Sequence, residues 1–366
     1  MNIKRFGRPA VVAVAAAIAL TSCAANEGAT SPAAEPSEET STLAGTLNAA
    51  GASSQGAAQE AWVASFQTAN PDVTINYDPS GSGAGRETFI AGGAAFAGSD
   101  SYLKDEELAG EFATCVPGTS AVDLPVYISP IAVIFNVDGV DELNLDADTL
   151  AKIFKGDITV WNDPAIAALN ADAKLPATNI TAVHRSDDSG TTKNFADYLN
   201  QVAPSVWTEK PADAFPFQTG EGAQGTSGVV DAVTNGVGTI GYADASRAGD
   251  LGVAKIKVGD EFVAYSAEAA AAVVDGSPLV EGRADNDLAI ELDRKTTDPT
   301  HYPLVLVSYA IVCTEYADAE QGELVKNYVG FMASEEGQTE AAASAGAAPL
   351  SSELQAKVAE VVASIK

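Results

Sequence analysis

Short apolar runs alternate with amphipathic stretches along most of the chain after residue 43, and serines and glycines separate them. In residues 46–69 an apolar run ends in Gly and Ser, and the stretch that follows places Trp62 and Phe66 four residues apart, the spacing of one buried helix face. This strand–turn–helix pattern predicts an α/β fold with a mostly parallel sheet. It recurs in residues 73–96, with a helix over 86–96, in residues 96–112, with an acidic helix start, and in residues 179–202, where Phe195, Leu199 and Val202 fall on one helix side.

The other segments predict further buried strands and helices. Residues 124–136 have the pattern of a double strand interrupted by Pro130, and residues 146–170 that of a helix, a turn and a second helix opened by Pro164. Residues 238–244 and 302–313 resemble buried strands, and residues 324–366 are helical with an Ala/Gly-rich break near 344–349. No segment repeats at a fixed period, which argues against solenoids and propellers.

The turns between strands and helices carry candidate chemistry. Each turn presents backbone N–H groups at the positive end of a helix dipole. Ser, Thr and Gly are also common helix caps, which explains any one of these turns by itself. Several such turns at one place would form an oxyanion site, so the sequence favours anion binding.

The segment "HRSDDSGTT", residues 184–192, strengthens this interpretation. Arg185 offers planar donors suited to an oxyanion or a carboxylate. Asp187 lies two residues along an extended segment, on the same face, where it could fix the guanidinium. Ser189 to Thr191 then open a helix and add N–H and O–H donors. One cation paired with one acid leaves little net charge, so binding would rest mainly on neutral donors.

A second carboxylate, Asp100, ends the strand-like "AGSD" of residues 97–100. An ionised carboxylate only accepts hydrogen bonds. Facing an oxyanion, it would repel one without a proton, such as sulfate, and accept from one that keeps a proton, such as phosphate. The alternative is that Asp100 caps the helix after it.

Charge and the N-terminus narrow the class of protein. The chain has 366 residues, enough for two domains, and a formal net charge of −30, which argues against nucleic acid as a partner. Residues 1–22 have the basic start and short apolar run of a signal peptide, and "LTSC" resembles a lipobox ending at Cys23. An ordinary signal peptide with an incidental cysteine is the alternative. Residues 23–42 are rich in Ala, Ser, Thr, Pro and Glu and predict a disordered tether.

The other two cysteines, Cys115 and Cys313, suggest a disulfide because an exported protein meets an oxidising environment. Two buried thiols are the alternative. With two histidines and no cysteine pair at ligand spacing, we expect no zinc or other metal site.

Several distinctive segments, in order, resemble the PstS family of phosphate-binding proteins of bacterial ABC importers. The likeness covers about residues 43–350 and rests on "LNLDADTLAKIFKGDITVWNDPAIAALN" (143–170), "HRSDDSGTT", "SGSGAG" (80–85), "FAGSD" (96–100), "GTIGYAD" (238–244) and "YPLVLVSYAIV" (302–312). The resemblance implies a two-lobed α/β periplasmic-binding-protein fold of the class II type, with phosphate in the cleft. Chain crossings near Val126 and Leu304 would make residues 43–126 and 305–366 the first lobe, which holds both Cys115 and Cys313, and residues 127–304 the second.

The resemblance also assigns ligand roles. The motif "GASS" differs from the Thr-Phe that the family often has there, so this loop is the weakest transfer. The implied roles are a hydroxyl donor at Ser53, a main-chain N–H donor at Ser54, a hydroxyl donor at Ser82, the acceptor of the phosphate proton at Asp100, the guanidinium contact at Arg185 with Asp187 as its partner, and helix-start donors at Ser189, Gly190 and Thr191.

The resemblance implies a lipid-anchored receptor on the extracytoplasmic face of the cell membrane, which binds inorganic phosphate and delivers it to membrane permease subunits. We expect a monomer without cofactor, without catalysis and without nucleic acid.

Three alternatives remain open. The same fold could bind another oxyanion such as sulfate or molybdate, or serve as a surface sensor or adhesion protein. A secreted phosphatase is the third, but catalytic triads need side chains that converge through space, metal-dependent phosphoryl chemistry needs clustered ligands, and "SGSGAGRE" lacks the ending of a P-loop.

Overall fold

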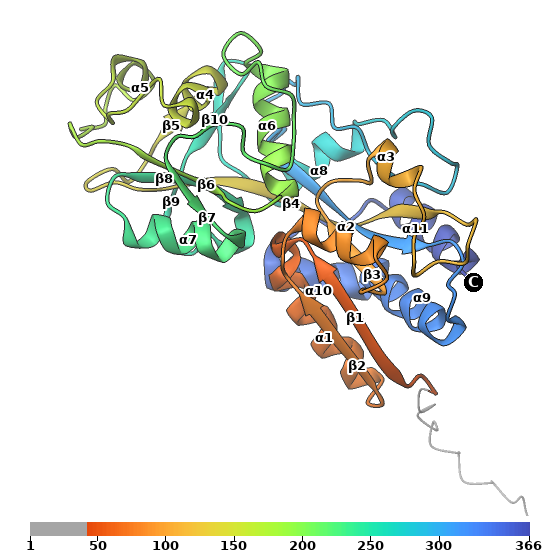
Figure 1. Cartoon of the computed structure of the whole chain (residues 1–366). Coiled ribbons are helices and arrows are strands. Elements are labelled where there is room, and N and C mark those ends of the chain that lie inside the picture. Colours follow the sequence, from red (N-terminus) through yellow and green to blue (C-terminus); the bar gives the residue numbers. More distant parts are fainter. Residues whose placement is uncertain (1–41) are drawn as a thin grey trace, which may run out of the picture. The chain divides into compact units, whose positions relative to one another are not determined.

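Two long, buried strands run side by side through the middle of the main sheet in the computed structural model, which describes residues 42–366 (Figure 1). They are β4 (Ala121–Asn136) and β12 (Val305–Cys313), and nearly every residue of both is buried. Strands covered on both faces are mostly apolar, as these are. The predicted signal peptide, the lipidation site Cys23 and the tether up to residue 41 lie outside the described residues.

The main sheet is mixed, not mostly parallel as predicted. Its strand order is β2-β1-β3-β12-β4-β8-β6-β7, and β9 also pairs with β4. The outer strands pair in parallel on both sides, whereas β12 is antiparallel to β3 and to β4, and β4 is antiparallel to β8. The prediction failed because β4 and β12 are neighbours in the sheet but are separated by residues 137–304 in the sequence. Local sequence patterns do not reveal the relative direction of two such strands.

Strand β4 changes partner along its length. It pairs with β12 up to Pro130 and with β8 from Ile131 onward, and the N–H of Ile131 bonds to the carbonyl of Leu304. Pro130 lacks an N–H and therefore fits where one ladder ends and the next begins. The predicted double strand is thus one strand of 16 residues.

This change of partner divides the sheet into two halves. We call residues 42–130 with 305–366 the first half and residues 131–275 the second half; residues 276–304 connect them. The first half contains β1 (Gly45–Gly51), η1 (Ser53–Gln55), α1 (Gly56–Ala69), β2 (Val73–Asp78), α2 (Ser82–Ile90), β3 (Phe96–Ser99), α3 (Asp105–Leu108), α9 (Ala319–Ala333), α10 (Glu335–Ala345) and α11 (Ser352–Ser364).

The second half contains β5 (Asn144–Leu145), α4 (Ala147–Lys155), α5 (Pro164–Leu169), β6 (Thr181–Arg185), α6 (Gly190–Val202), β7 (Glu221–Ala223), α7 (Gly225–Asn235), β8 (Thr239–Asp244), η2 (Ala245–Arg247), β9 (Gly252–Val253), β10 (Lys255–Val258), β11 (Glu261–Val263) and α8 (Ala267–Asp275). Strands β5, β10 and β11 form a separate small sheet.

Most predicted helices are present, with two corrections. Trp62 and Phe66 are buried on α1, and Pro164 opens α5, as expected. The helix predicted over residues 86–96 ends at Ile90, because Gly92 has a positive φ of 82° and the chain turns there. On α6, Phe195 and Leu199 are buried, but Val202 is 38% exposed at the last helical turn.

Cys115 and Cys313 form a disulfide, and both lie in the first half. The bond joins the end of β12 to the segment before β4. Within residues 42–366, no helix has the length and apolar character needed to cross a membrane.

A buried carboxylate lies near the change of partner along β4. Asp244, at the end of β8, accepts hydrogen bonds from the Tyr127 hydroxyl of β4 at 3.1 and 3.2 Å and from the N–H of Ser246 at 3.0 Å. Burial raises the pKa of Asp244 to about 6, and the charge of Asp100 adds to this shift, against the opposing hydrogen bonds of Ser246.

We predict that Asp244→Asn makes stability less dependent on pH. The raised folded-state pKa means that the Asp244 contribution is present below pH 4 and is lost as the pH rises through about 6. Relative to the variant, the wild type should lose up to about 3 kcal/mol of unfolding free energy between pH 4 and pH 7.5. Urea unfolding at both pH values measures this, with the exposed Asp250→Asn as control. Equal pH slopes for all three proteins would contradict the prediction.

Candidate functional site

The buried carboxylate of Asp100 is the centre of the candidate site. Asp100 follows β3 and is 4% exposed. Three hydroxyl groups bond to it: Ser54 to Oδ1 at 2.6 Å, Ser308 to Oδ1 at 2.6 Å and Thr191 to Oδ2 at 2.8 Å. Burial raises the pKa of Asp100, and these hydroxyl groups and the charge of Arg185 oppose the shift without cancelling it.

Asp100 does not cap a helix, which removes the alternative raised from the sequence. The helix after it, α3, begins at Asp105, and its N-cap residue is Lys104. The carboxylate instead accepts from residues far away in sequence. Asp100 therefore joins three segments of the chain and remains a candidate site residue.

Arg185 and Asp187 form the ion pair that their spacing predicts. Arg185 ends β6 and is buried, and its Nε donates to Oδ1 of Asp187 at 2.8 Å while Nη2 pairs with Oδ2. The N–H of Gly225, at the start of α7, also donates to Asp187 Oδ1 at 3.0 Å. Burial alone would raise the pKa of Asp187, but the hydrogen bond and charge of Arg185 outweigh it and lower the pKa. The Asp187 carboxylate is therefore ionised near neutral pH.

Within the described residues, Arg185 Nη1 has no hydrogen-bond partner, so this nitrogen can donate to a ligand. The orientation of the guanidinium is meanwhile fixed by two bonds to one carboxylate, the geometry that gives arginine its specificity for planar or tetrahedral anions.

Helix starts from both halves meet around Asp100. Ser82 opens α2, and its Oγ accepts the N–H of Asp100 at 3.1 Å. A Cβ placed on Gly190, the first residue of α6, would lie 2.7 Å from both the Asp100 Cβ and the Ser82 Oγ. Only glycine fits at this position, and its absent side chain lets the start of α6 approach the first half.

Ser189 and Ser53 are partly engaged within the protein. Ser189 is the N-cap of α6: its Oγ accepts the N–H of Thr192 at 3.2 Å, and its own N–H bonds to the carbonyl of Asp213. Ser53 Oγ accepts the N–H of Thr226, at the start of α7, at 3.0 Å. The Ser53 and Thr226 hydroxyl groups also lie 3.0 Å apart and either can donate to the other, whereas the hydroxyl hydrogen of Ser189 remains available to a ligand.

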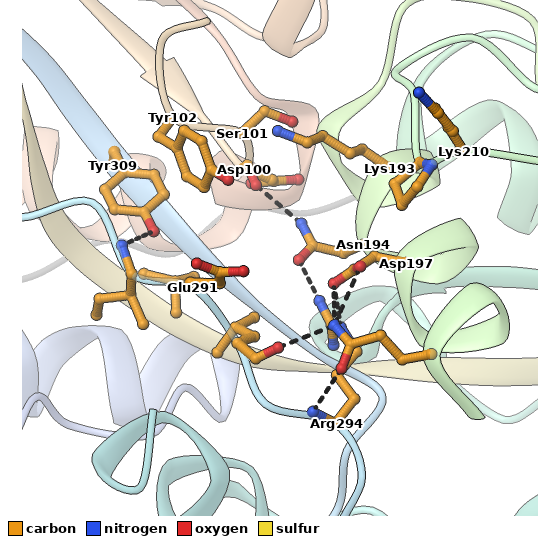
Figure 2. A pocket seen from close by; sticks show the side chains of 15 residues that line it. Asp100, Ser101, Tyr102, Lys193, Asn194, Asp197, Lys210, Glu291, Arg294 and Tyr309 are labelled. Carbon is orange, nitrogen blue, oxygen red and sulfur yellow. Dashed lines mark hydrogen bonds and ion pairs between the residues drawn. The ribbon is translucent and has the colours of Figure 1, made fainter. Parts of the chain in front are cut away.

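A cavity of about 340 Å³ borders the site (Figure 2). Of the predicted site residues, only Asp100 lines it. Figure 2 shows Asn194 between Asp100 and Arg294: its amide donates to the Asp100 carbonyl at 2.8 Å, and its oxygen accepts from Arg294 at 2.6 Å. Lys193 lies over the ring of Tyr102 in the same cavity, 4.3 Å from the ring centre. The hydroxyl groups that donate to Asp100 therefore lie beside this cavity and do not line it.

Metal ligands are not part of the arrangement. In residues 42–366, no group of three or more His, Cys, Asp or Glu side chains is placed to hold a metal ion. Hydroxyl groups, N–H groups and one guanidinium are donors suited to an anion, and the Asp100 carboxylate is an acceptor.

Comparison with known proteins agrees with this chemistry. The model of the PBP superfamily domain matches residues 36–336. Phosphate-binding protein PstS3 of Mycobacterium bovis BCG is 37% identical over 339 residues, which cover 90% of each chain. PstS2 of the same organism is 35% identical over 374 residues, the full length of both chains.

The chain belongs to the PstS family of phosphate-binding proteins. A solved high-affinity periplasmic phosphate-binding protein, determined with phosphate bound, is similar in structure with a TM-score of 0.68 and 22% identity, covering 86% of this chain and 93% of that chain. This PstS-family chain therefore has the periplasmic-binding-protein fold, in agreement with the fold class predicted from sequence.

The structure adds residues that the sequence did not single out. Ser308 of β12 donates to Asp100, and Gln55 donates to Ser308 Oγ at 2.7 Å, which leaves the hydroxyl hydrogen of Ser308 for the carboxylate. The start of α7, with Gly225 and Thr226, is a further helix start at the site. Its segment "GAQGTSG" has the same kind of Gly/Ser turn before a helix as the turns noted in the sequence, so the signal was present. Ser308 lies inside a mostly apolar strand and gave none.

We predict that Ser308→Ala raises the pKa of Asp100 further. The variant keeps the burial that disfavours the charged carboxylate but removes one of the hydroxyl donors that stabilise it. A ¹³C NMR titration of the Asp100 carboxyl carbon measures the shift, with the exposed Ser120→Ala as control. An unchanged or lower pKa in Ser308→Ala would show that Ser308 does not stabilise the ionised form.

Proposed function

We propose that this PstS-family protein binds inorganic phosphate outside the cytoplasm and delivers it to the membrane permease of an ABC importer. The observation that carries the proposal is the buried Asp100 carboxylate among hydroxyl, N–H and guanidinium donors from both halves. The names of its relatives, which are phosphate-binding proteins, support the same ligand.

In the proposed complex, the ligand oxygens accept hydrogen bonds from Arg185 and from the helix starts. The donors are the hydroxyl groups of Ser53, Ser82, Ser189 and Thr191 and the main-chain N–H groups of Ser54 and Gly190. Ser54 and Thr191 now donate their hydroxyl groups to Asp100, so their bonds would rearrange or be shared when the anion binds. The dipoles of α2 and α6 favour the negative charge.

Asp100 supplies the selectivity. Phosphate keeps a proton near neutral pH and can donate it to the carboxylate, whereas sulfate has none and meets only repulsion. Because Asp187 neutralises Arg185, the site has little positive charge with which to overcome that repulsion. The proton of the anion therefore decides which anion binds.

The two halves would act as lobes, with the boundaries predicted near residues 126 and 304 and the ligand in the cleft between them. Because donors and acceptor come from both, a bound anion would favour the arrangement in which the lobes meet. The permease would then recognise the closed form.

Lipidation of Cys23 after removal of residues 1–22 would hold the protein at the outer face of the membrane. The segment 23–42 would act as a tether of roughly 25 Å. The Cys115–Cys313 disulfide fits an oxidising compartment. In this proposal the protein works as a monomer, without a cofactor and without catalysing a reaction.

The direct test is calorimetric titration of the purified protein, stripped of ligand, with phosphate and then with sulfate at neutral pH. One-to-one phosphate binding without sulfate heat is the expected result. Binding of both anions would overturn the selectivity argument, and binding of neither would overturn the function. Separate titration with molybdate checks another oxyanion, and release of phosphate from an aryl phosphate ester would reveal a phosphatase.

We predict that Arg185→Ala weakens phosphate binding by roughly ten- to a hundredfold, because it removes charge-assisted hydrogen bonds of about 1.5–3 kcal/mol. Asp187→Ala should also weaken binding, since the guanidinium loses the two bonds that orient it. Titration calorimetry measures both, with Lys255→Ala, outside the site, as control. Wild-type affinity in Arg185→Ala would remove the arginine from the site.

We predict that Asp100→Asn relaxes the discrimination against sulfate. The amide removes the negative charge and can donate a hydrogen bond to an unprotonated oxygen. The ratio of the sulfate to the phosphate dissociation constant should fall at neutral pH, while the exposed Asp78→Asn keeps the wild-type ratio. A ratio as high in Asp100→Asn as in the wild type would mean that selectivity comes from another group.

A further inference from the structure

A buried ion pair outside the proposed phosphate site joins the two halves. Arg86, on α2 of the first half, is 1% exposed, and its Nη2 lies 2.7 Å from Oδ2 of Asp213. Asp213 is 5% exposed and lies between α6 and β7 in the second half. Ser101, also of the first half, donates its hydroxyl to Asp213 Oδ1 at 2.8 Å. Both carboxylate oxygens of Asp213 are thus bound by the opposite half.

Arg86 is fixed in position by its own half. Its Nε donates to both carboxylate oxygens of Glu107, at 3.1 and 3.2 Å, and its Nη1 donates to Ser99 Oγ at 3.0 Å. These contacts orient the guanidinium so that Nη2 alone bonds to the second half. Removing Asp213 would therefore leave the arginine in place but without its partner across the interface.

Asp213 is also linked to the start of α6. Its main-chain carbonyl accepts the N–H of Ser189 at 2.9 Å, one residue before Gly190 at the proposed site. Burial alone would raise the pKa of Asp213, but the charge of Arg86 and the hydrogen bond of Ser101 outweigh it and lower the pKa. The pair is ionised over the pH range in which the protein would work.

We infer that Arg86 and Asp213 determine the affinity for phosphate without touching it, by stabilising the arrangement in which the two halves meet. The inference rests on the proposed function. When the halves separate, the buried Asp213 carboxylate loses both Arg86 and Ser101, whereas Arg86 keeps Glu107 and Ser99 of its own half. Contact between the halves therefore supplies the partners of the Asp213 carboxylate. The opening equilibrium, and through it phosphate affinity, therefore depends on this pair.

Lys104 of the first half also lies 3.6 Å from Asp213 Oδ2, with its own side chain exposed. A separate, exposed ion pair between the halves provides a natural comparison. Arg247 of η2 lies 3.0 Å from Glu60 of α1, but the two side chains are 35% and 75% exposed. Exposed ion pairs contribute little because water and salt screen them. The buried pair should therefore dominate, although both pairs span the same two halves.

The test compares Asp213→Asn with two matched variants, each of which replaces one carboxylate by an amide. Glu107→Gln removes an acid that contacts the same arginine from within the first half, and Glu60→Gln removes the exposed pair. In Asp213→Asn the phosphate dissociation constant should rise about tenfold or more, mainly through faster phosphate dissociation. The exposed Glu60→Gln should stay within about twofold of the wild type, and Glu107→Gln should lose less affinity than Asp213→Asn, because an amide oxygen can still accept a hydrogen bond from Arg86 Nε.

Small-angle scattering of the ligand-free proteins gives a readout that does not depend on phosphate. Asp213→Asn should have a larger radius of gyration than the wild type and the two comparison variants. Wild-type dissociation rate and radius of gyration in a folded Asp213→Asn would overturn the inference, as would an equal loss of affinity in Glu107→Gln, which would assign the effect to the environment of Arg86. If the wild type itself fails to bind phosphate, the proposed function fails, and the radius of gyration alone then decides whether the pair stabilises the contact between the halves.

Discussion

The burial of the Asp100 carboxylate is the constraint on which the site depends. A carboxylate removed from water needs several hydrogen-bond donors, or it becomes protonated or destabilises the fold. The hydroxyl donors come from three distant elements: Ser54 belongs to η1, Thr191 to α6 in the other half, and Ser308 to β12. The arrangement of the whole chain is therefore needed to satisfy one side chain, and the site exists only where both halves are in contact.

The acidic chain adds a second constraint. With a formal net charge of −30, the protein as a whole repels an anion. Arg185 is balanced by Asp187 at the site, and Arg86 is balanced by Asp213 and Glu107 outside it, so neither arginine contributes a free positive charge. Recognition must then come from hydrogen bonds at contact distance, since at physiological salt the field of the remaining charges is screened within about 8 Å. Such a site discriminates by protonation state and shape more than by charge.

Local patterns predicted the parts of this structure that local interactions decide. The helix faces of Trp62 and Phe66, Pro164 at the start of α5 and the Arg185–Asp187 pair all follow from spacing within a few residues. The mixed sheet, the donation from Ser308 and the Arg86–Asp213 pair link residues that are more than a hundred positions apart. For these contacts, the residue types alone are compatible with many partners, and only the fold determines which residues meet. Gly92 is an intermediate case between these two groups. The turn at Gly92 is local, but the apolar residues around it have a helix-like pattern, so the sequence predicted that the helix continues.

The contacts between the halves have two different consequences for a binding protein. The hydrogen bonds to Asp100 lie where the proposed ligand would bind, so they would change when an anion enters. The Arg86–Asp213 pair lies outside that position and, in our inference, stabilises the contact between the halves with or without an anion. A ligand can shift an opening equilibrium only by its differential affinity for the two arrangements. A stronger pair would therefore raise affinity but leave the ligand-free protein closed more often. If the protein delivers phosphate to a permease, as proposed, a stronger pair would also slow release, so its strength would be limited both by the affinity that capture needs and by the opening that delivery needs.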